Sequence, residues 1–230
     1  MAVVALNEQL YFPDIENADD DGLLAVGADL SVERLLLAYR SGIFPWFEDE
    51  GLPFWFSPDP RCVLYPTEIN ISKSMKTLLN RQSFTVSFDR DFVYVIEQCA
   101  ETRRKQDDLT WISPYFIEAY TKLHEAGYAH SVEVWKNGTI VGGLYGVSIG
   151  ACFSGESMFT HVSNASKFGF IQLVKKLAEK NFVMIDCQVM NPHLKSLGAK
   201  DIDRKIFLGE LKKALKRQTI KQSWEKMLAE

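Results

Sequence analysis

Three polar side chains interrupt two apolar segments of this sequence, and their types suit hydrogen bonding and proton transfer. Glu156 lies in the run SGESMF, and Asp186 and Gln188 lie in the run VMIDCQV. Carboxylates are rarely buried without a partner, so these groups indicate either a satisfied buried network or a functional site. Because perturbed carboxylates cluster at functional sites, the three groups together favour a site.

The spacing of Asp186 and Gln188 predicts how they are placed. Residues two apart in a β-strand face the same side, so their Cβ atoms are expected about 7 Å apart while Cys187 points away. The carboxylate and the amide then either bond each other as a buried pair or converge on a third group.

Two tryptophans form a second group of candidates. Trp46 and Trp111 each follow a turn, and neither belongs to a periodic apolar face. Tryptophans in loops can act as stacking platforms for a nucleic-acid base. Hydrophobic lids over a core are the more common role of such residues.

Basic residues also gather on one predicted helix. Lys73, Lys76 and Arg81 could contact phosphates there, although a solvated charged face is the usual explanation of such a run. The run Gly155-Glu156-Ser157 lacks the second glycine of a nucleophile elbow, which argues against a serine hydrolase. No metal site is predicted, because metal-ligand spacing is missing among the four histidines, His124, His130, His161 and His193.

The elements that must position these groups divide the chain into two parts. Residues 1–62 are rich in turn formers and aromatics and predict a small irregular domain with one helix, capped by Ser31 and ended by Gly42. From Val63 onward, residues 63–230 alternate strands with helices and predict one mixed-sheet domain, which gives an α+β protein. The expected helices are 72–81, 91–100, a helix from Ser113-Pro114 to Gly127, 164–180 and 204–216, with a charged loop at 101–108. The expected strands are 84–88, 131–135 and 139–145 around an Asn137-Gly138 hairpin turn, one through Phe153, and 183–189.

Composition places the chain among ordinary globular proteins. It has 230 residues, 47% of them hydrophobic, and a net charge of −4, which argues against a general nucleic-acid coat but not against a local basic patch. The four cysteines form no C-x-x-C pair and are expected to be reduced. With no signal-peptide pattern and no apolar run of membrane-spanning length, a cytoplasmic protein without a membrane partner is expected.

In the order of the chain, these motifs resemble those of the leucyl/phenylalanyl-tRNA–protein transferase family. The resemblance covers about residues 10–210. Residues 217–230 carry no motif. The matching pieces are GLLAVGADLS, LLAYRSGIFPWF, SPDPR, TWI, EAYTKLHEAGYAHSVEVW, GGLYG, GESMF, NASK, IDCQ and HLKSLGAKDIDR.

The resemblance implies a small N-terminal domain joined to an acetyltransferase-like (GNAT) domain. It also implies an enzyme that moves leucine or phenylalanine, with methionine as a further candidate donor, from charged tRNA to the α-amine of proteins beginning with arginine or lysine, marking them for degradation by the N-degron pathway. No cofactor is implied. The pyrophosphate loop of acetyl-CoA enzymes is missing between Phe153 and Phe168, which counts against the rival prediction of an N-acetyltransferase.

The resemblance also assigns roles to residues. Trp46 and Trp111 are expected to hold the 3′-terminal adenosine, and Asp186, Gln188 and Glu156 to be catalytic. The donor side chain is expected in a pocket formed by Leu144, Phe153, Met158, Leu173 and Ile185. Departures from the family pattern at Leu144, Leu173, Phe56 and Ala28 bear on donor preference, since a methylene in an apolar pocket is worth about 1–3 kcal/mol.

The chemistry of an aminoacyl ester predicts a simple mechanism. The ester is already activated, so the amine can attack it directly, without a covalent enzyme intermediate. We expect the Gln188 carbonyl to orient the amine and Asp186 to hold the Gln188 side-chain amide. Glu156 is expected to recruit the cationic N-terminus or to orient the donor. A module that only binds aminoacyl-tRNA or N-terminal arginine is the non-enzymatic alternative.

Overall fold

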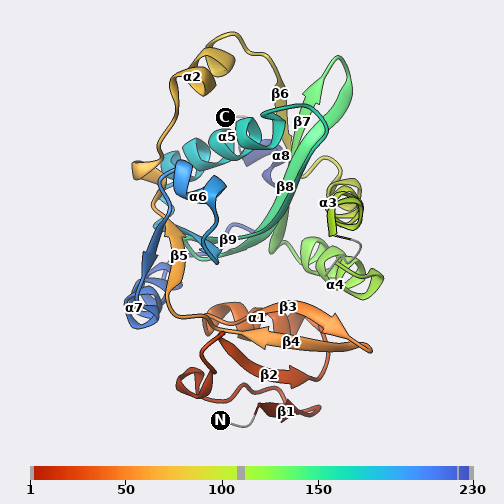
Figure 1. The fold of residues 1–230 in the computed structure, drawn as a ribbon, viewed down its shortest axis with the longest axis vertical. Helices are drawn as coiled ribbons and strands as arrows, with labels where there is room; N and C mark the ends of the chain where they lie inside the picture. The colour runs from red at the N-terminus through yellow and green to blue at the C-terminus, as the bar shows by residue number, and fades with distance from the viewer. Residues whose placement is uncertain (1–2, 108–111, 222, 228–230) are drawn as a thin grey trace.

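The computed structural model describes residues 3–107, 112–221 and 223–227 (Figure 1). These residues form two β-sheets, a small one near the N-terminus and a larger one in the rest of the chain. The predicted fold class, α+β with a small N-terminal domain and a mixed-sheet domain, is confirmed.

The N-terminal region is more regular than the sequence predicted. Its four strands lie in the order β1-β2-β4-β3, with helix α1 between β2 and β3 in the chain. Ser31 caps α1 as expected, because its side chain accepts a hydrogen bond from the Arg34 N–H. The elements are β1 (Val4–Leu6), the 3₁₀ turn η1 (Ile15–Asn17), β2 (Leu23–Gly27), α1 (Val32–Arg40), β3 (Phe44–Asp49) and β4 (Leu52–Phe56).

The larger sheet has seven strands in the order β11-β5-β10-β9-β8-β7-β6. All its neighbouring pairs are antiparallel except β9 and β10, which run parallel. The Asn137-Gly138 turn joins β7 to β8 as predicted. The strands are β5 (Arg61–Leu64), β6 (Thr85–Phe88), β7 (Ala129–Lys136), β8 (Thr139–Ile149), β9 (Cys152–Thr160), β10 (Met184–Gln188) and β11 (Lys200–Ile202).

Helices cover both faces of this sheet (Figure 1). One apolar core joins α3 and α4 to one face and extends into the N-terminal sheet, so the two parts of the chain share that core. A second core packs α5 on the opposite face. The helices are η2 (Pro66–Glu68), α2 (Lys73–Asn80), α3 (Phe92–Asp107), α4 (Pro114–Glu125), α5 (Ala165–Glu179), α6 (Pro192–Ser196), α7 (Arg204–Ala214) and α8 (Trp224–Met227).

One prediction about local structure was wrong. The segment 101–108 was expected to be a charged loop, but α3 continues through Asp107. Helix propagation is not visible in a local charge pattern. No element was predicted for residues 217–230, where Trp224 at the start of α8 is fully buried.

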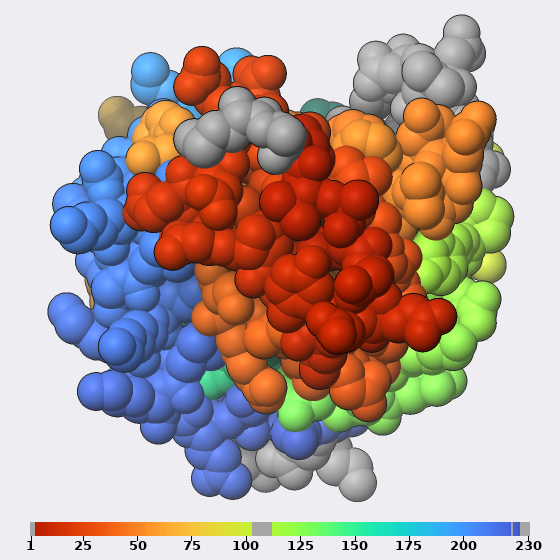
Figure 2. Space-filling view, turned by 90° about the horizontal axis from the view of Figure 1, so that it is seen from below, coloured from red at the N-terminus to blue at the C-terminus, as the bar shows by residue number. Residues whose placement is uncertain are grey.

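From below, the N-terminal residues cover the middle of the molecule, between α7 on one side and α4 on the other (Figure 2). Within the described residues, no helix is both long and apolar enough to cross a membrane.

Candidate functional site

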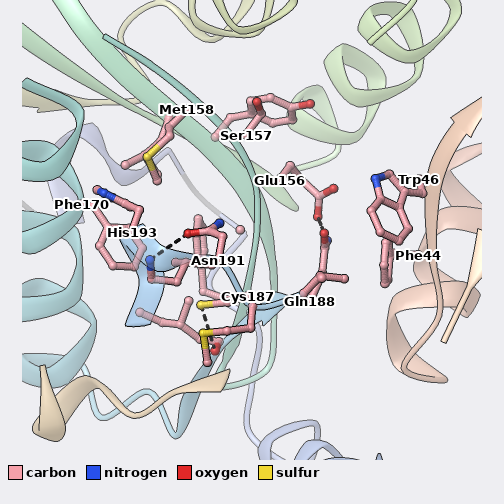
Figure 3. Close-up of a pocket in the computed structure, with 18 of the residues that line it drawn as sticks. Phe44, Trp46, Glu156, Ser157, Met158, Phe170, Cys187, Gln188, Asn191 and His193 are labelled. Atoms are coloured by element: carbon pink, nitrogen blue, oxygen red, sulfur yellow. Dashed lines mark hydrogen bonds between the residues drawn. The ribbon is translucent and has the colours of Figure 1, made fainter. Parts of the chain in front are cut away.

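A cavity of about 810 Å³ lies where the N-terminal sheet meets the edge of β9 and β10 (Figure 3). Phe44, Pro45 and Trp46 of β3 form one side. Residues of β8, β9, β10, α6 and the segment between β10 and α6, with Phe170 of α5, form the other sides.

The cavity exists because β9 and β10 separate. The two strands pair only from Met184 to Asp186, opposite Cys152 to Ser154. Beyond Asp186, β10 is bulged relative to β5, and Gln188 adopts a left-handed backbone with φ of 62°. The bulge turns the Gln188 side chain into the gap, where it lines the cavity.

The Gln188 side chain is held by Glu156. Its Nε2 donates a hydrogen bond of 3.0 Å to Glu156 Oε1, as Figure 3 shows. The amide nitrogen is the donor in this bond, so the other end of the Gln188 side chain is its carbonyl oxygen, an acceptor. The expectation that Asp186 holds this amide was therefore wrong. So was the expectation that Cys187 points away, since it lines the cavity.

Asp186 lies behind the cavity wall and is paired with Arg61. The Arg61 guanidinium donates to both carboxylate oxygens, at 2.8 Å and 2.7 Å. Asp186 also accepts a hydrogen bond of 3.0 Å from the Gln188 backbone N–H, which supports the left-handed turn. The regular strand assumed from the sequence would have placed both side chains on one face, and the bulge removes that alignment.

Two buried tyrosines complete the polar network, and sequence reasoning missed both as site residues. The hydroxyls of Tyr39 and Tyr120 lie 2.5 Å apart, and Tyr120 donates to Glu156 Oε2 at 3.3 Å. Desolvation and the nearby charge of Glu156 raise the pKa of each tyrosine well above its usual value, so both stay protonated.

Glu156 is the most perturbed carboxylate of the site. Desolvation raises its pKa to about 7, although hydrogen bonds from Tyr39, Gln188 and Tyr120 act in the opposite direction. Near neutral pH the group therefore exchanges between its protonated and ionised forms, as a proton-handling group at a functional site does.

Most of the predicted donor pocket is found in the cavity. Leu144, Phe153, Met158 and Ile185 line it. Leu173 does not, because it is fully buried in the core behind it, and Phe170 of the same helix contributes instead. Helical periodicity places residues 170 and 173 on neighbouring positions of one face, but it does not tell which of them reaches the cavity.

Trp46 lies at the rim of the cavity, whereas the three predicted phosphate-binding residues lie away from it. Trp46 is 36% exposed and meets the ring of Phe56 edge-on at 5.0 Å. Trp111 lies outside the described residues. Lys73, Lys76 and Arg81 are exposed on or beside α2, at the end of the molecule opposite the N-terminal sheet (Figure 1).

Among the residues that the structure describes, no three metal-ligating side chains come together. His130 is buried and bonds Asp89 Oδ2 through Nδ1, and the half-buried His193 borders the cavity.

An apolar floor, an oriented amide and a carboxylate with a raised pKa lie together in one cavity, a combination that marks a candidate enzyme site. Two family models match the chain: leucyl/phenylalanyl-tRNA protein transferase over residues 63–212, and the N-terminal domain of the same family over residues 28–59. The chain belongs to the leucyl/phenylalanyl-tRNA–protein transferase family.

Relatives with that name match nearly the whole chain. The transferase of Syntrophobacter fumaroxidans is 52% identical over 98% of this chain and 96% of its own length. That of Azotobacter vinelandii is 54% identical over 87% of this chain and 89% of its own.

Solved structures resemble the chain only distantly. The ribosomal-protein-alanine N-acetyltransferase of Brucella melitensis has a TM-score of 0.34 at 12% identity, covering 49% of this chain and 85% of that one. L-PGS from Bacillus licheniformis has a TM-score of 0.43 at 13% identity, and the match covers 74% of this chain and 54% of that one.

Proposed function

We propose that the enzyme transfers leucine or phenylalanine, with methionine as a further donor, from aminoacyl-tRNA to the α-amine of proteins that begin with arginine or lysine. The product would carry a destabilising N-terminus, which marks it for degradation. The proposed mechanism rests on one observation: the Glu156–Gln188 hydrogen bond lies beside an apolar floor in the same cavity.

The donor is proposed to enter with its side chain against the floor. Leu144, Phe153 and Ile185 are each at most 2% exposed, so the floor is closed and apolar. Trp46 at the rim, together with Trp111, would stack on the terminal adenosine, because base–aromatic stacking tolerates any base and needs an exposed ring face. The ester carbonyl would then lie between rim and floor, near Gln188.

The reaction is proposed to be direct aminolysis. The neutral amine attacks the ester carbonyl, a C–N bond forms, the C–O bond to the ribose breaks, and the amine proton ends on the released 3′-hydroxyl. An α-amine has a pKa of about 7.7–8.0, so a useful neutral fraction exists near neutral pH. The Gln188 carbonyl would accept a hydrogen bond from the amine and aim its lone pair.

Glu156 is proposed to position the Gln188 side chain and to stabilise charge on the attacking amine. In its ionised form it holds the Gln188 amide and offsets the positive charge that develops on the attacking nitrogen. Asp186 acts as a positioning residue, because it bonds the Gln188 backbone, Arg61 and the Ser154 hydroxyl and does not line the cavity.

The charge distribution supports separate approaches for the two substrates. Residues 1–62 hold 12 acidic and 3 basic side chains, a net charge of −9, and residues 63–230 hold 18 acidic and 23 basic ones, a net charge of +5. An acidic N-terminal region beside the cavity would attract a cationic N-terminus, and the basic region would attract tRNA phosphates, Lys73, Lys76 and Arg81 among its contacts.

The test mixes the purified enzyme with tRNA charged with labelled leucine and a model protein whose first residue is arginine. A matched protein that begins with glycine is the control. Label on the arginine protein alone is the expected result. Equal labelling of both proteins would refute the acceptor specificity, and no labelling of either would refute the transfer.

A further inference from the structure

Trp224 is a buried anchor of the C-terminal segment. Trp224 is fully buried, whereas its neighbours Ser223 and Glu225 are exposed. Its backbone N–H donates a hydrogen bond of 2.7 Å to Asp89 Oδ2. The resemblance to the transferase family gave no role to this part of the chain.

The anchor point is a buried acid–imidazole pair. Asp89 Oδ2 bonds His130 Nδ1 at 2.8 Å, and both side chains are at most 1% exposed. The Trp224 ring stacks on the imidazole with centroids 4.0 Å apart and planes within 8° of parallel. The stacked imidazole and the hydrogen bond from the Trp224 backbone N–H to Asp89 together hold the indole in place.

The same indole touches the wall of the donor pocket. Trp224 lies against Phe153, with ring centroids 5.8 Å apart, and against Phe182 at 6.2 Å. Trp224 does not line the cavity and Phe153 does, so the indole backs the Phe153 ring. Gly146, the partner of His130 on β8, makes room for that ring, since a Cβ there would come within 2.5 Å of it.

We infer that Trp224 determines donor specificity by holding Phe153 and so setting the depth of the pocket. Protein cores have few voids, so a floor residue can move only as far as the side chain behind it allows. Loss of the indole leaves space into which Phe153 can withdraw, which favours the larger donor. The inference rests on the proposed function, because it concerns the donor pocket of that reaction.

The test is a graded series, Trp224→Phe, Trp224→Leu and Trp224→Ala, in the full-length enzyme. The measured quantity is the ratio of kcat/KM for phenylalanyl-tRNA to kcat/KM for leucyl-tRNA. We expect the ratio to rise as ring volume is lost, by at least about fivefold in Trp224→Ala, with the change mainly in KM for the donor. Trp224→Phe keeps a ring against Phe153, so its ratio of the two kcat/KM values should stay within about twofold of wild type.

Trp135→Ala is the matched control. Trp135 lies on the same strand as His130 and contacts Ser87 and Arg90 rather than the pocket. It should lower stability without changing the donor ratio. If wild type is active with both donors and the Trp224 variants lower kcat/KM for both by one common factor, the inference about Trp224 is overturned but the proposed function is not. A wild type that transfers neither donor would overturn the proposed function itself.

Discussion

Arg61 and Asp186 form a buried, bidentate ion pair at the junction between the N-terminal sheet and strand β10. Arg61 also donates to the Gly42 carbonyl at 3.2 Å, and its guanidinium lies between the rings of Phe44 and Phe207, 4.8 Å and 4.6 Å from their centroids. Phe44 lines the cavity. One side chain therefore ties the rim of the cavity to the strand that carries Gln188.

Breaking this pair should be costly. Arg61→Ala leaves the Asp186 carboxylate buried and unpaired, so the free energy of unfolding should fall by about 3–5 kcal/mol. Arg61→Lys should be more stable than Arg61→Ala but less stable than wild type, because an ammonium cannot reproduce two parallel hydrogen bonds. Urea unfolding at neutral pH measures the stability of both Arg61 variants. Arg40→Ala, which alters an exposed arginine, is the control. A midpoint that is the same for Arg61→Ala and Arg40→Ala would exclude a structural role for the pair.

The raised pKa of Glu156 predicts a pH-dependent stability. The native state keeps the proton up to about pH 7, whereas an unfolded glutamate loses it near pH 4.5. The native state therefore binds more protons between these values, and its stability falls as pH rises through that window. Glu156→Gln removes this loss. Between pH 5 and pH 8, the free energy of unfolding of the variant should therefore rise relative to that of wild type by about 2.5 kcal/mol.

Denaturant unfolding at both pH values tests this prediction, and Asp49→Asn, which alters an exposed carboxylate, serves as control. A difference between Glu156→Gln and wild type that stays constant from pH 5 to pH 8 would show that the carboxyl has an ordinary pKa.

Trp46 is predicted to bind the tRNA end rather than to support the core. Trp46→Ala should raise the KM for charged tRNA by about 5- to 100-fold with a smaller effect on kcat, because base stacking is worth about 1–3 kcal/mol. Leu52→Ala removes an exposed apolar side chain from the neighbouring strand and should leave KM unchanged. An unchanged KM in Trp46→Ala, with lowered thermal stability, would assign this residue to the core instead.

The basic residues of α2 are predicted to contact tRNA phosphates. In the triple variant Lys73→Ala, Lys76→Ala, Arg81→Ala, the slope of log affinity against log salt should become shallower by about 2–3, since each lost phosphate contact removes roughly 0.7–0.9 from it. A triple variant of Lys175, Lys212 and Lys213 changes the net charge equally. If both triples alter the slope by the same amount, the effect is general attraction and not contact at α2.

The sequence predicted the elements whose signals are local. Ser31 and Ser113 accept hydrogen bonds at their helix N-termini, and Asn137-Gly138 forms its hairpin, because caps and tight turns depend on a few adjacent residues. Glu156 and Gln188, which their apolar neighbours single out in the sequence, lie within hydrogen-bond distance of each other.

The details that escaped prediction depend on residues far apart in the chain. The bulge at Gln188 changes which side chains of β10 face the cavity, and strand periodicity does not show it. Arg61 was visible only as part of the motif SPDPR, because its partner Asp186 lies 125 residues later. Trp224 had no periodic context at all, and only packing against His130 and Phe153 gives it a place.

In the proposed mechanism, Gln188 is held by Glu156 and aims the attacking amine. Single-turnover transfer of leucine from charged tRNA to an arginine-started protein, measured with the dissociation constant of the tRNA, tests it most directly. Gln188→Ala should slow transfer by about 100-fold and leave the dissociation constant within about twofold of wild type. Gln98→Ala removes a glutamine that bonds Glu101 and His161 on the surface, and it should change neither value. A Gln188→Ala enzyme that transfers at the wild-type rate, or whose loss of rate is matched by loss of tRNA binding, would contradict the account.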